Sequence, residues 1–277
     1  MTTKVPTMKR DGGEMPILGL GTWELTGEEC TQAVDAALRM GYRHIDTASM
    51  YGNEEQVGNG MKASGVDRGA VFLTTKLSVE NVKADGVRRS CDRSLQLLDT
   101  DYLDLLLIHW PDKNVPLAET FGAMAELKSE GKTRHVGVSN FTIKYMGRAL
   151  DVSAEAIFCN QIEYHPYIKQ GPIMKFCREH DVPVVAYSPL ASGQVLKDET
   201  LAEIGRKHDK SPAQVALRWV LRQTGVAAVP KSTSEEHLRQ NLEVFDFELD
   251  KDDLAAIGAL EHDGRIIDPS WAPDWDS

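Results

Sequence analysis

The sequence predicts an α/β fold, a (β/α)8 barrel of the TIM type with an N-terminal β-hairpin and extra helices. Short apolar runs, rich in β-branched and aliphatic residues, alternate with longer amphipathic stretches along the chain. Eight such runs can be counted, and eight strands that alternate with helices make up this barrel. A linker rich in Pro, Gly or Ser does not interrupt the alternation. We therefore favour one domain over residues 1–277 rather than a doubly wound sheet, which alternates in the same way.

A hairpin is expected to precede the barrel. Two apolar arms, Val5–Met8 and Met15–Leu18, flank the turn sequence Asp11-Gly12-Gly13. Glycine after an acidic residue between two apolar runs is a hairpin signal. The longer run Met15–Leu20 supplies the first barrel strand in this interpretation.

Seven further strands follow the first. They are predicted at His44–Asp46, Val71–Lys76, Asp104–Ile108, His135–Val138, Ile157–Ile162, Val184–Tyr187 and Val226–Val229. Several of these runs are almost continuously apolar, which is typical of parallel strands that are covered on both faces.

The helices are predicted by apolar residues at helical spacing and by their ends. Thr26 and Glu29 have the spacing of a capping box, and Gly41 is expected to end that first helix. Two helical patterns, Leu201–His208 and Ser211–Gln223, lie between the seventh and eighth strands, so one of them must be an extra helix. Ser211 is expected to cap the second pattern, with Pro212 at its first position.

The composition excludes several classes of protein. The chain carries 31 Lys+Arg against 42 Asp+Glu, a net charge of −11, which argues against binding to nucleic acid. The longest aliphatic run, Leu105–Ile108, is far shorter than the ~20 residues that span a bilayer. The four cysteines form no C-x-x-C pair and the histidines lack metal-ligand spacing. We expect a monomer in the reducing cytoplasm that acts on a small molecule and binds no metal.

Polar residues stand at the ends of most of the predicted strands or just after them. They are Asp46, Lys76, His109, Ser139, Asn140, Gln161, Glu163, Tyr187, Ser188 and Lys231. In a (β/α)8 barrel these positions meet at one mouth, where catalytic groups stand. Ionisable groups that gather there perturb each other's pKa values.

Tyr51 supplies a possible proton for chemistry at this mouth. A phenol has a pKa near 10 and is a poor acid at neutral pH, but a nearby Lys76 ammonium would favour the phenolate. Lowering the pKa by ~2 units corresponds to ~3 kcal/mol of differential interaction. Asp46 would keep Lys76 charged, and His109 would donate a hydrogen bond to the same substrate oxygen. This arrangement predicts general acid catalysis at a carbonyl group.

Other catalytic motifs are missing from the sequence. It has no G-x-G-x-x-G dinucleotide fingerprint, no G-x-S-x-G elbow and no H-E-x-x-H zinc motif. A barrel hydrolase that uses Asp46 and Glu163 as a carboxylate pair stays open as an alternative, although it gives Tyr51 and Lys231 no role.

The sequence resembles the aldo-keto reductases through segments that run in order along nearly the whole chain. These segments are Gly19–Trp23, Gly41–Ala48, Tyr51–Glu54, His109-Trp110, Val136–Phe141, Asn160–Pro166 and Val229–Ser232. The length of the chain is similar to that of the short bacterial branch, which includes 2,5-diketogluconate reductases and small-aldehyde reductases.

The resemblance implies reduction of aldehydes or ketones by NADPH on a barrel whose hairpin closes the bottom. The catalytic tetrad of the family falls on Asp46, Tyr51, Lys76 and His109, with Tyr51 as the proton donor. The cofactor contacts fall on Ser139, Asn140 and Gln161 at the carboxamide, Tyr187 at the nicotinamide ring, Ser188 and Leu190 along the pyrophosphate, Lys231, Ser232 and Thr233 at the 2′-phosphate, and His237 and Asn241 at the adenine end. By family position, Trp23, Met50 and Trp110 would line the substrate pocket.

The sequence departs from the family pattern at His237, where many members carry an arginine. A neutral imidazole lacks the fixed charge and the bidentate fork of a guanidinium, so we expect that NADH is tolerated beside NADPH. An alternative reading is a non-catalytic sensor of the nicotinamide cofactor, or a scaffold protein, on the same barrel. Trp271 and Trp275 lie in the C-terminal tail, Gly264–Ser277. They could fold over the pocket or pack on the barrel, and the sequence does not decide between these positions.

Overall fold

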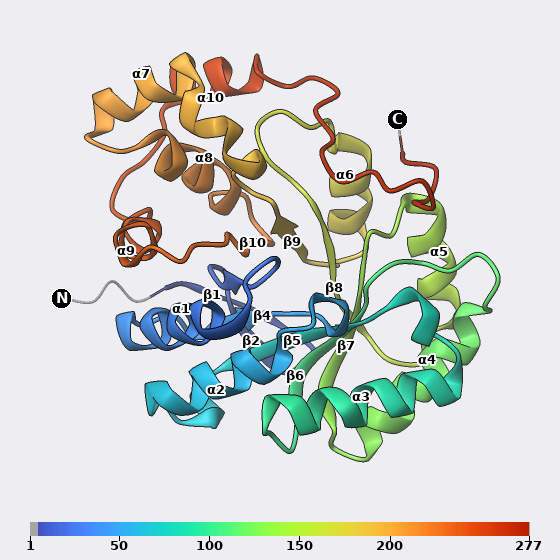
Figure 1. The fold of residues 1–277 in the computed structure, drawn as a ribbon. Helices are drawn as coiled ribbons and strands as arrows, with labels where there is room; N and C mark the ends of the chain where they lie inside the picture. Colours follow the sequence, from blue (N-terminus) through green and yellow to red (C-terminus); the bar gives the residue numbers. More distant parts are fainter. Residues whose placement is uncertain (1–4, 277) are drawn as a thin grey trace.

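The structure, a computed structural model, describes residues 5–276, and eight parallel strands in this part form one sheet (Figure 1). These strands are β3 Leu20–Gly21, β4 His44–Asp46, β5 Phe72–Leu77, β6 Leu103–Ile108, β7 Thr133–Ser139, β8 Ile157–Glu163, β9 Val184–Tyr187 and β10 Val226–Ala228. Their order in the sheet follows the chain. The two edges then meet, because Gly19 N donates to Ala228 O (2.9 Å) and Gly21 N donates to Pro230 O (3.0 Å). The predicted barrel is confirmed.

The strands bury side chains on both of their faces. Neighbouring residues of a strand point to opposite faces of the sheet, and β6 follows this rule. Leu105 and Leu107 belong to the cluster inside the barrel, whereas Leu106 and Ile108 belong to the larger cluster between the sheet and the helices. This double burial explains the almost continuous apolar sequence of the strand.

The hairpin is present, but its arms differ from the prediction. β1 Thr7–Arg10 pairs with β2 Gly13–Pro16, and the turn at Asp11 and Gly12 has φ values of 47° and 73°. The predicted first strand, Met15–Leu20, is therefore wrong as one element. Its first residues belong to β2, and only Leu20 continues into β3. Met15 is fully buried in the inner cluster, so the hairpin supplies part of the barrel floor.

Ten α-helices lie within residues 5–276. They are α1 Gly27–Met40, α2 Glu54–Ser64, α3 Ala84–Leu98, α4 Leu117–Ser129, α5 Ile143–Val152, α6 Gly171–Glu179, α7 Glu199–His208, α8 Pro212–Leu221, α9 Glu235–Leu242 and α10 Lys251–Gly258. Four 3₁₀ segments complete this part: η1 Ser49–Tyr51, η2 Arg68–Ala70, η3 Val79–Asn81 and η4 Ala191–Lys197. Every one of these helices is too short or too polar to cross a membrane.

The predicted helix ends were right in part. Ser211 caps α8 in a complete capping box with Gln214, and Gly41 ends α1 in the left-handed conformation. The capping box predicted for α1 is wrong, because Thr26 is the N-cap residue but its side chain makes no capping hydrogen bond. Helix α8 packs against β10, whereas α7 packs on α8 and α10, so α7 is the extra helix. Figure 1 shows α7, α8 and α10 gathered together, apart from α2, α3 and α4.

Candidate active site

A pocket of about 850 Å³ opens at the carboxyl ends of the strands, where the sequence placed the polar residues. Fifteen of the predicted site residues line it: Trp23, Asp46, Met50, Tyr51, His109, Trp110, Asn140, Gln161, Tyr187, Ser188, Leu190, Lys231, Ser232, His237 and Asn241. Lys76, Ser139 and Thr233 lie outside this lining. Lys76 and Ser139 are buried behind it, and Thr233 is exposed. The volume lies in the range of roughly 300–1,000 Å³ that is typical of ligand pockets.

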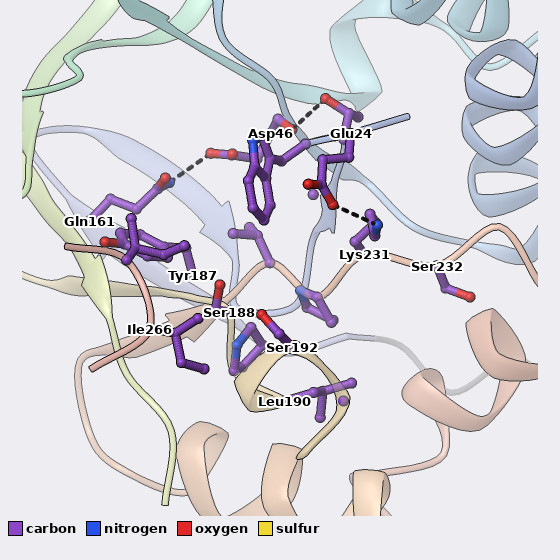
Figure 2. Close-up of a pocket in the computed structure, with 18 of the residues that line it drawn as sticks. Glu24, Asp46, Gln161, Tyr187, Ser188, Leu190, Ser192, Lys231, Ser232 and Ile266 are labelled. Atoms are coloured by element: carbon purple, nitrogen blue, oxygen red, sulfur yellow. Dashed lines mark hydrogen bonds and ion pairs between the residues drawn. The ribbon is translucent and has the colours of Figure 1, made fainter. Parts of the chain in front are cut away.

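A buried ion pair stands at the base of the pocket. Lys76 Nζ lies 2.6 Å from Asp46 Oδ1 and 2.7 Å from the carbonyl oxygen of Thr47. Gln161 Nε2 donates to the other oxygen of Asp46 at 2.7 Å (Figure 2). These bonds fix the ammonium group and the carboxylate. Burial by itself would lower the pKa of Lys76, but Asp46 and the hydroxyl of Tyr51 raise it, so the ammonium stays charged.

Tyr51 stands directly above this pair, at the end of η1. Its hydroxyl lies 3.4 Å from Lys76 Nζ, and Ser49 Oγ ties the start of η1 to the carbonyl oxygen of Lys76 at 2.8 Å. Burial raises the pKa of Tyr51, and the opposing effect of Lys76 is smaller, so the pKa lies above its ordinary value. Lys76 lowers the pKa as expected, but the expected net lowering is wrong, because burial outweighs the charge. The hydroxyl keeps its proton and can donate it.

His109 lies beside Tyr51, after β6. The two ring centroids are 5.7 Å apart and the planes meet at 76°. Asn140 Nδ2 donates to the backbone carbonyl oxygen of His109 at 3.0 Å. Burial and the charge of Lys76 hold the pKa of His109 well below its usual value, so the imidazole is neutral. It can donate one N–H to an oxygen placed near the hydroxyl of Tyr51.

A hydrogen-bonded network covers the ends of β7, β8 and β9. Tyr187 donates its hydroxyl proton to Asn140 Oδ1 (2.8 Å), and Asn140 Nδ2 also reaches Ser139 Oγ (3.1 Å). Ser139 Oγ donates to the carbonyl oxygen of Gln161 at 2.9 Å. These bonds fix the Tyr187 ring and the side-chain amide of Asn140 at the pocket, whereas the bond to Asp46 fixes the side-chain amide of Gln161.

Backbone strain gathers in the loop after β9. Ser188, Ala191 and Ser192 have φ values of 47°, 48° and 50°, a conformation that non-glycine residues seldom adopt. Such strain is often stored at binding sites. Ser192, Gly193 and Leu196 line the pocket, and our sequence analysis missed them. The dipeptide Ser192-Gly193, a turn signal, could have indicated the loop.

Residues just before α9 and within it line the end of the pocket away from the Asp46–Lys76 pair. Ser234 is the N-cap residue of this helix, and its side chain accepts a hydrogen bond from the backbone N–H of His237. Lys231 Nζ lies 3.5 Å from Glu24 Oε2, and both side chains are about half exposed. In Figure 2 these two side chains point toward each other. Glu24 was missed by the sequence analysis, although it lines the pocket and has a φ of 62°.

The C-terminal tail, whose position the sequence did not decide, forms one wall of the pocket. Trp271 lines the pocket and packs edge-on against Trp110, with 4.9 Å between ring centroids. Trp275 packs on the same Trp110 ring at 6.0 Å. Ile266 and Ile267 also line the pocket and were missed, because a short tail without periodicity gives no signal for where it docks.

Comparisons with known proteins agree with this geometry. The model of the aldo/keto reductase family matches residues 17–262. Methylglyoxal reductase DkgB of Escherichia coli O157:H7 is 43% identical over 266 residues, which cover 95% of this chain and 99% of that protein. A crystal structure provisionally named a 2,5-diketo-D-gluconic acid reductase B has a TM-score of 0.96 and 41% identity, covering 100% of this chain and 99% of the other. An aldo-keto reductase of Bombyx mori in complex with NADP has a TM-score of 0.89 and 34% identity, covering 98% and 99% of the two chains.

Proposed function

This chain belongs to the aldo/keto reductase family and is a carbonyl reductase, and we propose that Tyr51 protonates the carbonyl oxygen during reduction. The observation that carries this role is the position of the Tyr51 hydroxyl, 3.4 Å from an ammonium group that a buried carboxylate fixes in place. Charge that develops on the hydroxyl oxygen is stabilised by Lys76, while neutral His109 orients the substrate oxygen.

The nicotinamide cofactor supplies the hydride when it is bound. We propose that Tyr187 stacks on the nicotinamide ring and that Asn140 and Gln161 hold its carboxamide, with Ser139 supporting them from behind. The chemistry of these groups fits this cofactor, because a fixed aromatic ring and side-chain amides face one pocket. Ser188 and Leu190 would lie along the pyrophosphate.

We propose that NADPH is preferred over NADH. The cation of Lys231 and the hydroxyl of Ser232 face the end of the pocket that would hold the 2′-phosphate. Thr233 is exposed beside them and would contact the same phosphate. His237 and Asn241 would contact the adenine. Because His237 lacks the fixed charge of an arginine, we expect the protein to tolerate NADH as well.

Small carbonyl compounds with an apolar part are the proposed substrates. Trp23 and Met50 are exposed at the pocket mouth, with 43% and 49% of their surfaces accessible, and Trp110 closes the inner side. Such a wall favours apolar or mixed substrates over highly charged ones. The relatedness to a methylglyoxal reductase supports small α-dicarbonyl compounds within this class.

The experiment is a panel of aldehydes and ketones assayed for carbonyl-dependent oxidation of NADPH and NADH, with Tyr51→Phe as the matched variant. The ring is kept and the donated proton is removed, so we expect kcat to fall by ~10²–10⁴ with NADPH affinity unchanged. Retention of more than about a tenth of kcat, with chemistry rate-limiting, would refute the role of Tyr51. Cofactor binding without turnover in the wild type would instead favour the sensor or scaffold alternative.

The remaining expectations concern the whole protein. We propose that residues 1–277 form one domain that acts as a monomer in the cytoplasm. Light scattering of the purified protein at several concentrations tests the oligomeric state, and fractionation of the source cells tests the location.

A further inference from the structure

Glu163, the last residue of β8, is a fully buried carboxylate that receives hydrogen bonds from a distant part of the chain. Its Oε1 accepts from the backbone N–H of Ile266 at 2.7 Å and lies 2.9 Å from His165 Nε2. Its Oε2 accepts from the backbone N–H of Ile267 at 2.9 Å. The side chains of Glu163 and His165 are both 0% exposed. The hydrolase alternative, which needs Glu163 to face a substrate, loses its second carboxylate.

The direction of the bond between Glu163 and His165 follows from a neighbour. The backbone N–H of Tyr167 donates to His165 Nδ1 at 3.3 Å, so Nδ1 is an acceptor. The proton of the neutral imidazole therefore lies on Nε2, which donates to Glu163. Glu163 accepts from three donors, a role that an ionised carboxylate can fill and an amide cannot.

A second set of contacts ties the same tail to the loop after β8. The backbone N–H groups of His262 and Gly264 both donate to the carbonyl oxygen of Tyr167, at 3.1 and 3.2 Å. A Cβ atom on Gly264 would lie 2.7 Å from that oxygen, so only glycine fits this close approach. The tail is thus anchored immediately before it reaches the pocket.

The anchored segment forms the pocket wall described above. Ile266 and Ile267, whose backbone N–H groups bind Glu163, themselves line the pocket, and Figure 2 shows the side chain of Ile266 near Tyr187 and Ser188. Trp271, a few residues later, lines the pocket and packs on Trp110. Any movement of the two N–H groups therefore moves the wall.

We propose that Glu163 is a positioning residue that holds the tail as one wall of the carbonyl pocket and so sets the affinity for larger apolar carbonyl substrates. Glu163 does not touch the reacting atoms in this role. The inference rests on the proposed carbonyl reduction, since the wall matters for the substrate only if the pocket receives one. We expect a small dicarbonyl compound to bind beside Tyr51 with little contact to the tail, and an aromatic aldehyde to use the apolar surface of Trp271, which lines the same pocket.

The test compares Glu163→Gln with the wild type by two measurements. In Glu163→Gln the amide nitrogen replaces one of the two carboxylate oxygens and cannot accept a hydrogen bond. In either orientation of the amide, the backbone N–H of Ile266 or of Ile267 therefore loses its acceptor. We expect hydrogen exchange at Ile266 and Ile267 to become about tenfold faster or more, and KM for 2-naphthaldehyde to rise by about tenfold, the factor that 1.4 kcal/mol represents. Both kcat and KM for methylglyoxal should stay within about twofold of the wild type.

Two further variants separate positioning from general destabilisation. Trp271→Ala removes the wall and keeps the anchor, so it should raise KM for 2-naphthaldehyde while exchange at Ile266 stays slow; adding Glu163→Gln should then raise KM little further. Gly264→Ala disturbs the anchor without touching the buried carboxylate and should reproduce the KM shift if Glu163→Gln does not fold.

Unchanged exchange at Ile266 and Ile267 in Glu163→Gln, or an equal KM rise for both carbonyl compounds, would overturn the proposal. If the wild type reduces no carbonyl compound, the proposed function fails, whereas the exchange measurement still reports on the anchor.

Discussion

Removal of Lys76 from its ion pair tests the base of the pocket. In Lys76→Met the side chain keeps its approximate length but loses its charge, which leaves Asp46 buried without its cation. Breaking a buried pair by removing one partner typically costs about 3–5 kcal/mol of folding free energy. Asp46 keeps the hydrogen bond from Gln161 at 2.7 Å, so we expect a loss near the lower end, about 3 kcal/mol. Reduction should also be impaired, because Tyr51 loses the neighbouring ammonium.

A double-mutant cycle with Asp46→Asn measures the coupling. Each single variant leaves an unmatched group, whereas the double variant removes both charges, so its stability loss should be smaller than the sum by about 0.5–3 kcal/mol. Urea unfolding at neutral pH gives the free energies, and kcat with one aldehyde gives the functional cycle. A loss below about 1 kcal/mol in Lys76→Met, or additivity in both cycles, would refute the reasoning.

The contribution of the Lys76–Asp46 pair to the free energy of unfolding depends on pH in a defined direction. Asp46 and Tyr51 raise the pKa of Lys76 above its unfolded value although burial opposes them. The contribution of this group to stability is therefore fully present below the unfolded pKa of about 10.4 and is lost as the pH rises through the higher folded value. The stability difference between wild type and Lys76→Met should shrink only at strongly alkaline pH.

Four further predictions concern other parts of the protein. Burial raises the pKa of Tyr51, so the phenol should keep its proton from pH 6 to 9. We expect kcat/KM for carbonyl reduction to fall through loss of this proton only above about pH 10, and a fall in kcat/KM near neutral pH would contradict this. Lys231→Met should loosen NADPH far more than NADH in binding titrations, and equal loosening would remove Lys231 from the 2′-phosphate. Glu24→Gln should tighten NADPH and leave NADH unchanged, because Glu24 pairs with Lys231 at 3.5 Å and competes with the phosphate; weaker binding of both cofactors would show that the pair clasps them instead. Ser211→Ala should lower the unfolding free energy by about 0.5–2 kcal/mol through loss of the capping box of α8, as a urea titration can check.

The order of strands and helices and the polar residues at the strand ends could be predicted from the sequence, because both depend on local patterns. Buried parallel strands are continuously apolar whatever packs on them, and the first polar residue after each strand marks the barrel mouth. Asp46, Lys76 and His109 were found in this way. Element ends were less predictable: the single run Met15–Leu20 splits between hairpin and barrel, and Thr26 makes no side-chain cap.

Only the tertiary structure decided the properties that depend on residues far apart in the chain. The pKa of Tyr51 is raised rather than lowered because burial, which no motif encodes, outweighs the charge of Lys76. Glu24 pairs with Lys231, and Glu163 accepts a hydrogen bond from the backbone N–H of Ile266. More than a hundred residues of sequence separate the partners in each case. Hydrophobic periodicity specifies which face of an element is buried, but electrostatic balance and the docking of an aperiodic tail arise from distances that exist only once the barrel has closed.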